Sequence, residues 1–402
     1  MFPALLGSRL HCPYCYRSFT HKEIRFRCSG RVGVKKRCEM KLDRVLADQM
    51  GDHDPQYPVF DANGRKSTAV HEVCQAETHY RVCPRCHSQL PVQFGQIDSR
   101  LIALVGAKDS GKTVYMTVLL HELMNDVGAR IHASVLGADA STSNRFETVY
   151  QHALYDKHEL YGATPTAKKE RGGRRPLVFN LTIGGRSKVR STLLSFYDTA
   201  GEDMTTEHSI DQNVRYMTSA DGIILLLDPL QLRGARPHAA SDALLPELVS
   251  AEDSPTAVLA NIIKQLQGST GVKAGKRIEK PIAVAFTKMD ALQGSLPPGS
   301  PWLRTPPSGD SFNEPDSVEV HRHMQALLHE WAGRNVDETL ANSFSRYRLF
   351  GLSALGESPR LEGGGLQRVS ERGVQPHRVE DPFLWLMSEF GAIRKTVKPV
   401  GE

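Results

Sequence analysis

One glycine-rich loop constrains the fold of this chain more than any other feature. Residues 106–113 read Gly-Ala-Lys-Asp-Ser-Gly-Lys-Thr and fit the pattern G-x-x-x-x-G-K-[ST] at every fixed position. The loop follows an apolar run at Leu101–Val105, which predicts a strand, and precedes an amphipathic run, which predicts a helix. Such a loop cradles phosphate groups with backbone N–H groups and the positive end of the helix. The sequence therefore predicts a nucleoside triphosphate site on an α/β sheet.

Two side chains of this loop have expected roles of their own. Lys112 can reach the β and γ phosphates and assist catalysis, and the Thr113 hydroxyl can ligate Mg²⁺. An ordinary glycine-rich turn is the alternative, but the flanking strand and helix favour phosphate binding. The nucleotide contacts expected here come from Gly106, Ala107, Lys108, Asp109, Ser110, Gly111, Lys112, Thr113 and Val114.

A second motif, Asp-Thr-Ala-Gly-Glu, follows the predicted strand Thr192–Tyr197. The Asp198 carboxylate would hold Mg²⁺ through water, and Gly201 would contact the γ phosphate. Glu202 can orient the attacking water as a hydrogen-bond acceptor, but its negative charge near the γ phosphate predicts slow intrinsic hydrolysis. These residues have the arrangement of a nucleotide-dependent switch segment.

Two further motifs predict which base the site binds. Thr287, Lys288 and Asp290 follow the predicted strand Ile282–Phe286. A carboxylate there can accept hydrogen bonds from guanine N1–H and N2–H, a donor pair that adenine lacks, while the lysine stem covers the base. After the predicted strand Tyr347–Gly351, a backbone N–H can meet the guanine O6 in a loop formed by Ser353, Ala354 and Leu355. The predicted ligand is GTP, with GDP as the product of hydrolysis.

Apolar runs alternate with amphipathic segments from Arg100 onward, which is typical of a mostly parallel sheet flanked by helices. Gly184-Gly185 predicts a hairpin, so the strands on either side of it should be antiparallel. Helices are predicted after Lys112 and after Pro382. The fold class is therefore α/β, a P-loop NTPase domain over residues 99–397. Its six predicted strands are Leu101–Val105, Leu177–Ile183, Thr192–Tyr197, Gly222–Leu227, Ile282–Phe286 and Tyr347–Gly351.

Three segments rich in charge, proline or glycine interrupt this domain. They are Gly162–Pro176, Arg233–Pro255 and Gly294–Pro315, and the last two belong to expected insertions near residues 231–280 and 291–316. Because such compositions offer few apolar side chains to a core, we expect each segment to lack fixed structure without a partner.

All seven cysteines lie before residue 87, which is typical of a metal-binding module in a reducing compartment. Two C-x-x-C knuckles can offer four thiolates to a tetrahedral Zn²⁺ from Cys12, Cys15, Cys83 and Cys86. A redox dithiol is the alternative, but no βαβ context surrounds the knuckles. A second Zn²⁺ can be held by Cys28, Cys38, His71 and Cys74, although buried unligated cysteines are common and His21, His53 or His79 can substitute. Residues 1–98 are predicted to form a zinc-ribbon-like domain of short strands.

With these motifs in this order, residues 100–395 resemble the Ras-like branch of the TRAFAC P-loop GTPases. The pairing of an N-terminal zinc ribbon with Gly-Ala-Lys-Asp-Ser-Gly-Lys-Thr and Tyr-Asp-Thr-Ala-Gly-Glu also resembles the bacterial double-GTPase (DO-GTPase) proteins. That resemblance implies a role in bacterial conflict or defence systems beside a second GTPase.

The resemblance also implies roles for residues around the phosphates. Ras-like proteins supply a switch I threonine to Mg²⁺ and the γ phosphate, which implies Thr166 here, with Thr164 as the alternative. Asp109 stands where potassium-activated members carry an Asn, so K⁺ can assist; capping of the turn is the alternative. Lys108 stands where Ras has a Gly and can neutralise developing charge, or it is simply solvated. Arg171, Arg174 or Arg175 can supply an arginine finger in cis. The alternative is that these three residues form a solvated basic loop.

Charge and hydropathy set the remaining expectations. The net charge of +5 falls short of the concentrated basic stripe of a dedicated nucleic-acid binder. The longest apolar runs, such as Ile223–Leu227, are too short to cross a membrane, so we expect a cytoplasmic protein. The expected partner is a protein effector or a second GTPase, and the oligomeric state stays open.

The predicted function is a GTP-binding switch that hydrolyses GTP to GDP with Mg²⁺, slowly and with stimulation by a partner. Two alternatives stay open. One is a scaffold that holds nucleotide without turning it over. The other is a nucleic-acid-associated GTPase that acts through the basic side of the zinc ribbon, with a steep salt dependence of binding.

Overall fold

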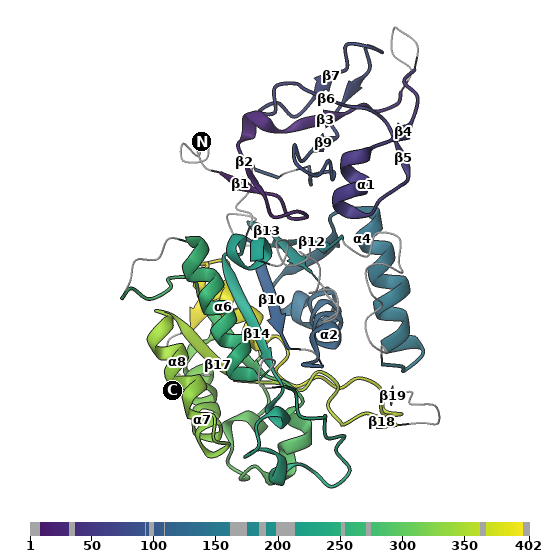
Figure 1. The fold of residues 1–402 in the computed structure, drawn as a ribbon. Helices are drawn as coiled ribbons and strands as arrows, with labels where there is room; N and C mark the ends of the chain where they lie inside the picture. Colours follow the sequence, from purple (N-terminus) through teal and green to yellow (C-terminus); the bar gives the residue numbers. More distant parts are fainter. Residues whose placement is uncertain are drawn as a thin grey trace.

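A computed structural model gives the fold of this chain (Figure 1). A small N-terminal module lies against a larger α/β domain. The described residues are 9–31, 37–92, 94–95, 100–107, 109–160, 175–184, 190–197, 214–250, 254–270, 275–361 and 367–396.

Four parallel strands form the centre of the larger domain, in the order β10, β14, β15 and β17. Their bounds are Ile102–Gly106 for β10, Gly222–Leu227 for β14, Ile282–Phe286 for β15 and Tyr347–Gly351 for β17. Most of their residues are buried because helices cover both faces of the sheet. Since the strands are parallel, the loops that follow them meet at one edge of the sheet, where ligands bind in such folds.

Three antiparallel strands form a second sheet, and β13 of this sheet lies beside β10. Their bounds are Ala133–Gly137 for β11, Leu177–Ile183 for β12 and Arg190–Phe196 for β13. All six predicted strands are present, and the pair around the predicted hairpin is antiparallel. Strand β11 is an addition that the sequence does not predict, because most of its residues are partly or fully exposed and form no apolar run. Among the described residues, hydrogen bonding divides the predicted six-stranded sheet into these two sheets.

Helices cover both faces of the parallel sheet. Ile102 and Leu104 of β10 point into a core covered by α2 and α9, whereas Ala103 points into a core covered by α6, α7 and α8. Strand side chains alternate between two faces, so one apolar strand supplies both cores. The helices are α2 (Lys112–Met124), α3 (Asp126–Arg130), α4 (Ala140–Arg145), η2 (Phe146–Asp156), α6 (Pro255–Thr270), α7 (Glu314–Glu330), α8 (Arg334–Ser343), α9 (Asp381–Glu389) and a helix over 214–219.

Both helices predicted from apolar spacing are confirmed. α2 begins at Lys112 and buries the predicted core residues Met116, Leu119, Leu120 and Leu123, whereas the fifth, Val127, is buried in the separate helix α3. α9 begins at Asp381 with proline in its first turn, where a missing N–H costs no helical hydrogen bond. The side chains that α9 buries include Phe383, Leu386 and Met387.

The expected lack of structure is wrong for the described parts of two inserted segments. Trp302, within Gly294–Pro315, is 1% exposed, and its carbonyl oxygen accepts hydrogen bonds from His377 and Arg378. Within Arg233–Pro255, Ala235 is fully buried. A few buried apolar residues therefore fix the conformation of these loops, although the composition of the loops does not predict that they pack into a core. Most of Gly162–Pro176 lies outside the described residues. Short elements of these regions and of the C-terminal part are η4 (Pro229–Gln231), η5 (Arg236–His238), η7 (Met289–Ser295), η8 (Pro301–Leu303), β16 (Phe312–Asn313), β18 (Arg360–Leu361), β19 (Gln367–Arg368) and β20 (Lys395–Thr396).

Most of the regular elements of the N-terminal module are two- and three-residue strands, as predicted. One helix, α1 (Arg44–Met50), is an addition: Asp43 caps its first turn by accepting a hydrogen bond from Leu46 N, and Gly51 ends it at φ +70°. The predicted domain boundary near residue 98 falls among residues outside the described part. The short elements are β1 (Leu10–His11), β2 (Ser18–Phe19), η1 (His21–Glu23), β3 (Arg25–Arg27), β4 (Lys41–Leu42), β5 (Pro55–Gln56), β6 (Val59–Phe60), β7 (Ala69–Val70), β8 (Glu77–Thr78) and β9 (Arg81–Val82).

Across the described part of the chain, no helix combines the length and the apolar character that a membrane crossing requires.

Candidate nucleotide site and metal clusters

The phosphate-binding loop leaves β10 at Gly106 and enters α2 at Lys112. A Cβ atom on Gly106 would lie 2.4 Å from Ser110 Oγ and 2.7 Å from Leu226 O, so a side chain there would clash with both. Gly111 adopts φ +82°, a conformation that also favours glycine. The two fixed glycines of the motif therefore give the loop its tight path beside β14.

Lys112 lies folded back across this loop. Its ammonium group donates hydrogen bonds to the carbonyl oxygens of Gly106 at 3.0 Å and Ala107 at 2.8 Å. The Ser110 hydroxyl also donates to Ala107 O, at 2.8 Å. The ammonium group of Lys112 is thus bound by neutral carbonyl oxygens. An anionic phosphate oxygen can replace these acceptors and form a stronger hydrogen bond with the ammonium group.

Several predicted site residues lie outside the described part of the chain. They are Lys108, Thr164, Thr166, Asp198, Gly201 and Glu202, together with Arg171 and Arg174. The last described residue before the Asp-Thr-Ala-Gly-Glu motif is Tyr197, which lines one small pocket with Lys112 and Leu104. The end of β13 therefore reaches the phosphate-binding loop.

The motif after β15 is tied to the same loop. The Thr287 hydroxyl donates a hydrogen bond to Ser110 O at 3.0 Å. Lys288 Nζ lies 2.6 Å from Asp228 Oδ2, and the Asp228 side chain is only 3% exposed. This ion pair anchors the lysine beside the ends of β14 and β15 and compensates its charge there.

Asp290 is held by the loop that follows β17. Its Oδ1 accepts a hydrogen bond from the Ser353 hydroxyl at 2.6 Å, and its Oδ2 accepts one from the Ser358 hydroxyl at 3.3 Å. The Ser353 hydroxyl itself accepts a hydrogen bond from Gly356 N at 2.8 Å. The carboxylate is thus oriented from both oxygens, each of which has lone pairs left for the two guanine donors.

A buried arginine supports this guanine-side loop from behind. Arg378 has a side chain with 0% exposure and pairs with Asp316 at 2.8 Å and Asp381 at 3.0 Å. The neighbouring residue His377 exchanges backbone hydrogen bonds with Ser353 at 2.8 and 3.0 Å. Because Arg378 and His377 also share the carbonyl oxygen of Trp302, one packed unit positions the backbone of Ser353.

Three residues of this region, Asp228, Ser358 and Arg378, are not among the predicted site residues. Asp228 had a readable signal, since it follows an all-apolar strand at the sheet edge where the other site loops meet. Ser358 and Arg378 carry no such signal, because Ser358 contacts Asp290, 68 positions away, and Arg378 contacts Asp316, 62 positions away, besides its neighbour Asp381.

Arg175 has a different place from the arginine finger that the sequence allowed. Its guanidinium lies 3.1 Å from Asp139 and 3.7 Å from Asp52, and its side chain is 12% exposed. It also lies 5.0 Å from the ring centroid of Tyr14. Because Asp52 and Tyr14 belong to the N-terminal module, Arg175 joins that module to the α/β domain.

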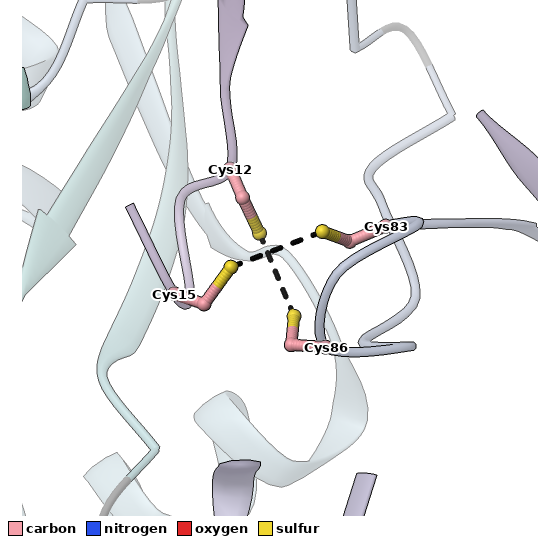
Figure 2. Close-up of side chains that lie close together, drawn as sticks. All are labelled: Cys12, Cys15, Cys83 and Cys86. Carbon is pink, nitrogen blue, oxygen red and sulfur yellow. Dashed lines mark hydrogen bonds between the residues drawn. The ribbon is translucent and has the colours of Figure 1, made fainter. Parts of the chain in front are cut away.

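Two sets of predicted metal ligands come together in the N-terminal module. The near cluster consists of Cys12, Cys15, Cys83 and Cys86, all buried (Figure 2). Its Sγ atoms lie 3.8 Å apart between Cys12 and Cys86 and 3.9 Å apart between Cys15 and Cys83. A tetrahedron with Zn–S bonds of about 2.3 Å has edges of about 3.8 Å, so the spacing suits Zn²⁺ and far exceeds a disulfide bond of about 2.05 Å.

Both knuckles of the near cluster have the same turn. The N–H of Tyr16 donates to Cys12 O, and the N–H of His87 donates to Cys83 O, each at 3.0 Å. Tyr16 and His87 adopt φ values of +61° and +58°. In each knuckle a backbone N–H also points at the first sulfur, at 3.4 Å on Cys12 and 3.3 Å on Cys83. Such donors stabilise a thiolate, the form that binds metal.

The far cluster consists of Cys28, Cys38, His71 and Cys74. Cys28 Sγ lies 3.6 Å from Cys74 Sγ, and the His71 Nδ1 atom lies 3.4 Å from the sulfurs of Cys38 and Cys74. Its His-x-x-Cys segment repeats the knuckle turn, since Gln75 N donates to His71 O at 2.7 Å with φ +58° at Gln75. The donor set and its spacing therefore suit a tetrahedral ion with three sulfur ligands and one nitrogen ligand.

Burial bears on what each set of thiols can do without a metal. It raises the pKa of the Cys12 and Cys83 thiols well above their usual range and raises the pKa of Cys28, whereas hydrogen bonds from the other thiols of the near cluster, Cys12 first, lower the pKa of Cys15 well below its usual range. The near cluster therefore holds thiols whose pKa values are shifted in opposite directions, and metal binding requires all four to be deprotonated.

A tight glycine-rich loop with the phosphate-binding motif and a carboxylate held at the same carboxyl edge of a parallel sheet are the features of a P-loop GTPase domain of the Ras-like type. The chain belongs to the Double-GTPase 2 family, whose model matches residues 100–343. It is thus a GTP-binding protein by family, and the resemblance to double-GTPase proteins is confirmed.

The chain is also similar to one curated relative and to solved structures. The chain is 30% identical over 329 residues to a Mycolicibacterium smegmatis protein with the provisional name ESX-1 scaffolding and assembly protein SaeC, covering 78% of this chain and 80% of that protein. A GDP-bound GTP-binding protein from Sulfolobus solfataricus matches at 12% identity and a TM-score of 0.27, over 64% of this chain and 48% of that chain. The signal recognition particle receptor complex SRb-GTP/SRX from Chaetomium thermophilum matches at 14% identity and a TM-score of 0.28, over 66% and 95%.

Proposed function

We propose that this chain is a Mg²⁺-dependent GTP switch that hydrolyses GTP to GDP slowly and is stimulated by a partner. One observation carries the proposal. Asp290 is held by Ser353 and Ser358 in a loop region that Thr287 joins to the phosphate-binding loop, so a base and a triphosphate can be bound together. A carboxylate at the base position selects guanine over adenine, because adenine would leave it without a donor.

The proposed phosphate and metal roles follow the motifs. Lys112 exchanges its loop carbonyls for phosphate oxygens, and the first turn of α2 supplies N–H donors. Thr113 ligates Mg²⁺ directly and Asp198 through water, with Thr166 of switch I as a further ligand. Glu202 orients the attacking water, and its charge slows the uncatalysed step. Asp109 is the residue through which K⁺ would act.

The partner we propose is a protein, either an effector or a second GTPase of a bacterial conflict system. A relative named for scaffolding and assembly supports a role in which the bound nucleotide controls protein contacts. In such a switch the nucleotide orders loops whose contacts with a partner differ between the two states.

We propose Zn²⁺ at both metal clusters as a structural ion. Four protein ligands in each cluster close the coordination shell and leave no position for a substrate or water, which is the pattern of structural rather than catalytic zinc. Metal binding there would contribute directly to folding of the module.

A second candidate is a scaffold that binds GTP without hydrolysing it. The name of the Mycolicibacterium smegmatis relative favours this reading, as does the carboxylate of Glu202 where a neutral side chain is usual. The two candidates differ in one measurable step, the cleavage of the γ phosphate.

Single-turnover GTP hydrolysis by the zinc-loaded protein separates the candidates. The assay uses excess protein over radiolabelled GTP with Mg²⁺, in potassium and then in sodium buffer, with ATP as competitor and Lys112→Ala as the inactive reference. Hydrolysis that requires Lys112 and ignores ATP supports the switch, and a faster rate in potassium supports the role of Asp109. Tight GTP binding without product, even after days, would instead identify a scaffold.

A further inference from the structure

The first zinc knuckle lies against the GTPase domain rather than pointing into solvent. Figure 1 places the module beside β12 and β13, and Val178 and Leu193 of these strands share one apolar cluster with the near cluster's cysteines. The Tyr14 hydroxyl donates to Asp139 Oδ2 at 2.6 Å. The knuckle is therefore fastened to the α/β domain by a buried polar contact.

Tyr16, the residue after the second cysteine, reaches further into that domain. Its hydroxyl lies 3.0 Å from Ser195 Oγ, and Ser195 Oγ donates to Pro13 O at 2.7 Å. Its backbone oxygen accepts a hydrogen bond from Ser219 Oγ at 2.8 Å. Tyr16 itself is 1% exposed and belongs to the core under the parallel sheet, not to the core of its own module.

Three tyrosine rings meet at this point. The Tyr16 ring lies 4.9 Å from Tyr216 and 6.1 Å from Tyr197, and the latter two rings lie 5.9 Å apart. Tyr197 is the last described residue before the Asp-Thr-Ala-Gly-Glu motif, and Tyr216 lies in the helix at 214–219 that follows it. A residue of the zinc knuckle thus contacts both ends of the stretch that contains this motif.

Two routes lead from these rings to the phosphate-binding loop. The Tyr216 hydroxyl accepts a hydrogen bond from Leu104 N at 2.8 Å, two residues before Gly106 on the same strand. Tyr197 lines one pocket with Lys112 and Leu104. Neither route passes through a residue outside the described part of the chain.

The position of Tyr16 depends on the geometry of the metal cluster. Its φ of +61° is rare for a bulky residue, and its N–H bonds to Cys12 O in the turn that brings Cys12 and Cys15 together. A metal bound to both sulfurs would hold this turn, whereas its loss would release the turn and with it the Tyr16 ring.

We propose that metal binding at the near cluster and nucleotide binding at the phosphate loop strengthen each other through Tyr16. The inference rests on the proposed function, since it requires GTP at that loop. A bound metal would hold the Tyr16 ring against Tyr197 and Tyr216, which contact residues next to the phosphate-binding loop. These side chains would then lose less conformational freedom when the nucleotide binds. Linkage requires the effect to be equal in both directions.

The far cluster provides an internal contrast. Its apolar neighbours in the described part of the chain are Ala76, Tyr57 and Phe60, all within the N-terminal module. The hydroxyl of Tyr57 accepts a hydrogen bond from Arg37, also within the module. Tyr57 is therefore a suitable control, because it is a tyrosine of the same module that does not share the contacts of Tyr16 with β13 and the 214–219 helix.

The first test compares equilibrium affinity for GTP in wild type, Tyr16→Ala, Tyr16→Phe and the matched control Tyr57→Phe, with zinc content measured for each. We expect Tyr16→Ala to weaken GTP binding by at least about fivefold, the lower end of typical coupling between sites. Tyr16→Phe, which loses only the contact with Ser195, should fall between, and Tyr57→Phe should match wild type. Equal affinity in Tyr16→Ala and wild type, both folded, would overturn the coupling.

The reciprocal test avoids any change at Tyr16. In Cys74→Ser, which removes a ligand of the far cluster, zinc affinity at the near cluster is measured by equilibrium competition with a chromogenic chelator. Saturating Mg²⁺ and GTP should raise that affinity by at least about fivefold, and an unchanged affinity would overturn the coupling. Wild type that binds GTP without such coupling refutes only this inference, whereas wild type that binds no GTP refutes the proposed function with it.

Discussion

The hydroxyl of Ser353 donates a hydrogen bond to Asp290 at 2.6 Å, joining two loops whose residues are 63 positions apart. Because the hydroxyl is in turn held by Gly356 N, the carboxylate is oriented before any base arrives. Preorganisation of this kind lowers the entropy lost on binding and sharpens discrimination between bases. The carboxylate of the proposed guanine site is therefore held in place by the folded protein.

Asp290→Asn should exchange the base preference. An amide loses the acceptor pair for guanine N1–H and N2–H, and its NH₂ group can instead donate to the O2 atom of xanthine. Hydrogen bonds to a charged partner contribute about 1.5–3 kcal/mol, so we expect GTP affinity to fall by roughly tenfold to a hundredfold while xanthosine triphosphate affinity rises. Fluorescence titration measures both, and the exposed Asp310→Asn serves as control. Unaltered GTP affinity would place the base elsewhere.

Lys112→Ala should remove most triphosphate affinity. The ammonium group now bonds to Gly106 O and Ala107 O, so its loss leaves two loop carbonyls without that donor and the phosphates without their nearest cation. We expect affinity for GTP to drop by at least about tenfold. Lys264→Ala, an exposed lysine on α6, should bind as wild type does. Full binding by Lys112→Ala would contradict the assigned phosphate site.

Metal analysis of the purified protein should find two zinc ions per chain, one for each cluster. Cys74→Ser should retain one of them, because the ligands of the near cluster remain intact. Cys83→Ser should instead lose the near-cluster ion and lower the melting temperature, since Cys83 lies in the buried cluster that includes Val178 and Leu193. One ion in wild type, unaltered by Cys74→Ser, would mean that the far cluster binds no zinc.

His321 should make the α/β domain sensitive to mild acid. Burial, with a smaller contribution from the Arg348 charge, lowers the pKa of His321 to about 4, and its Nδ1 accepts a hydrogen bond from Leu349 N at 3.0 Å. The folded pKa lies below the unfolded value of about 6.5, so the unfolded state binds more protons between these values. The contribution to stability is therefore complete above about pH 6.5 and is lost as pH falls towards 4.

Urea denaturation at pH 7 and pH 5 measures this effect. From the two pKa values we expect wild type to lose roughly 2 kcal/mol more than His321→Asn, in which an amide oxygen can replace the Nδ1 acceptor without titrating. Equal losses in the two proteins would show that His321 titrates normally in the folded state.

Much of the fold and part of the site can be predicted from the sequence. Long apolar runs such as Gly222–Leu227 become buried parallel strands, and the motifs that follow β10, β15 and β17 meet because parallel strands end at one edge. Strand β11 escapes prediction because its pattern of exposure is that of an edge strand. The local sequence pattern therefore predicts a helix or strand when the burial of that element's own residues determines its structure.

Contacts between distant segments could not be predicted in the same way. Tyr14 and Tyr16 look in sequence like ordinary spacers of a zinc knuckle, yet their partners are Asp139 and Ser195, 125 and 179 positions away. Trp302 gives a loop of proline and glycine its anchor only through the packing of helices and strands around it. No composition or periodicity encodes these pairings.

Calorimetric titration of the zinc-loaded protein with GTP and with ATP, in Mg²⁺ buffer, tests the central claim most directly. The proposed guanine site predicts that one GTP binds per chain. The affinity for ATP should be at least about tenfold weaker, because adenine offers Asp290 no pair of donors. Equal affinity for the two nucleotides, or no binding of GTP, would contradict it.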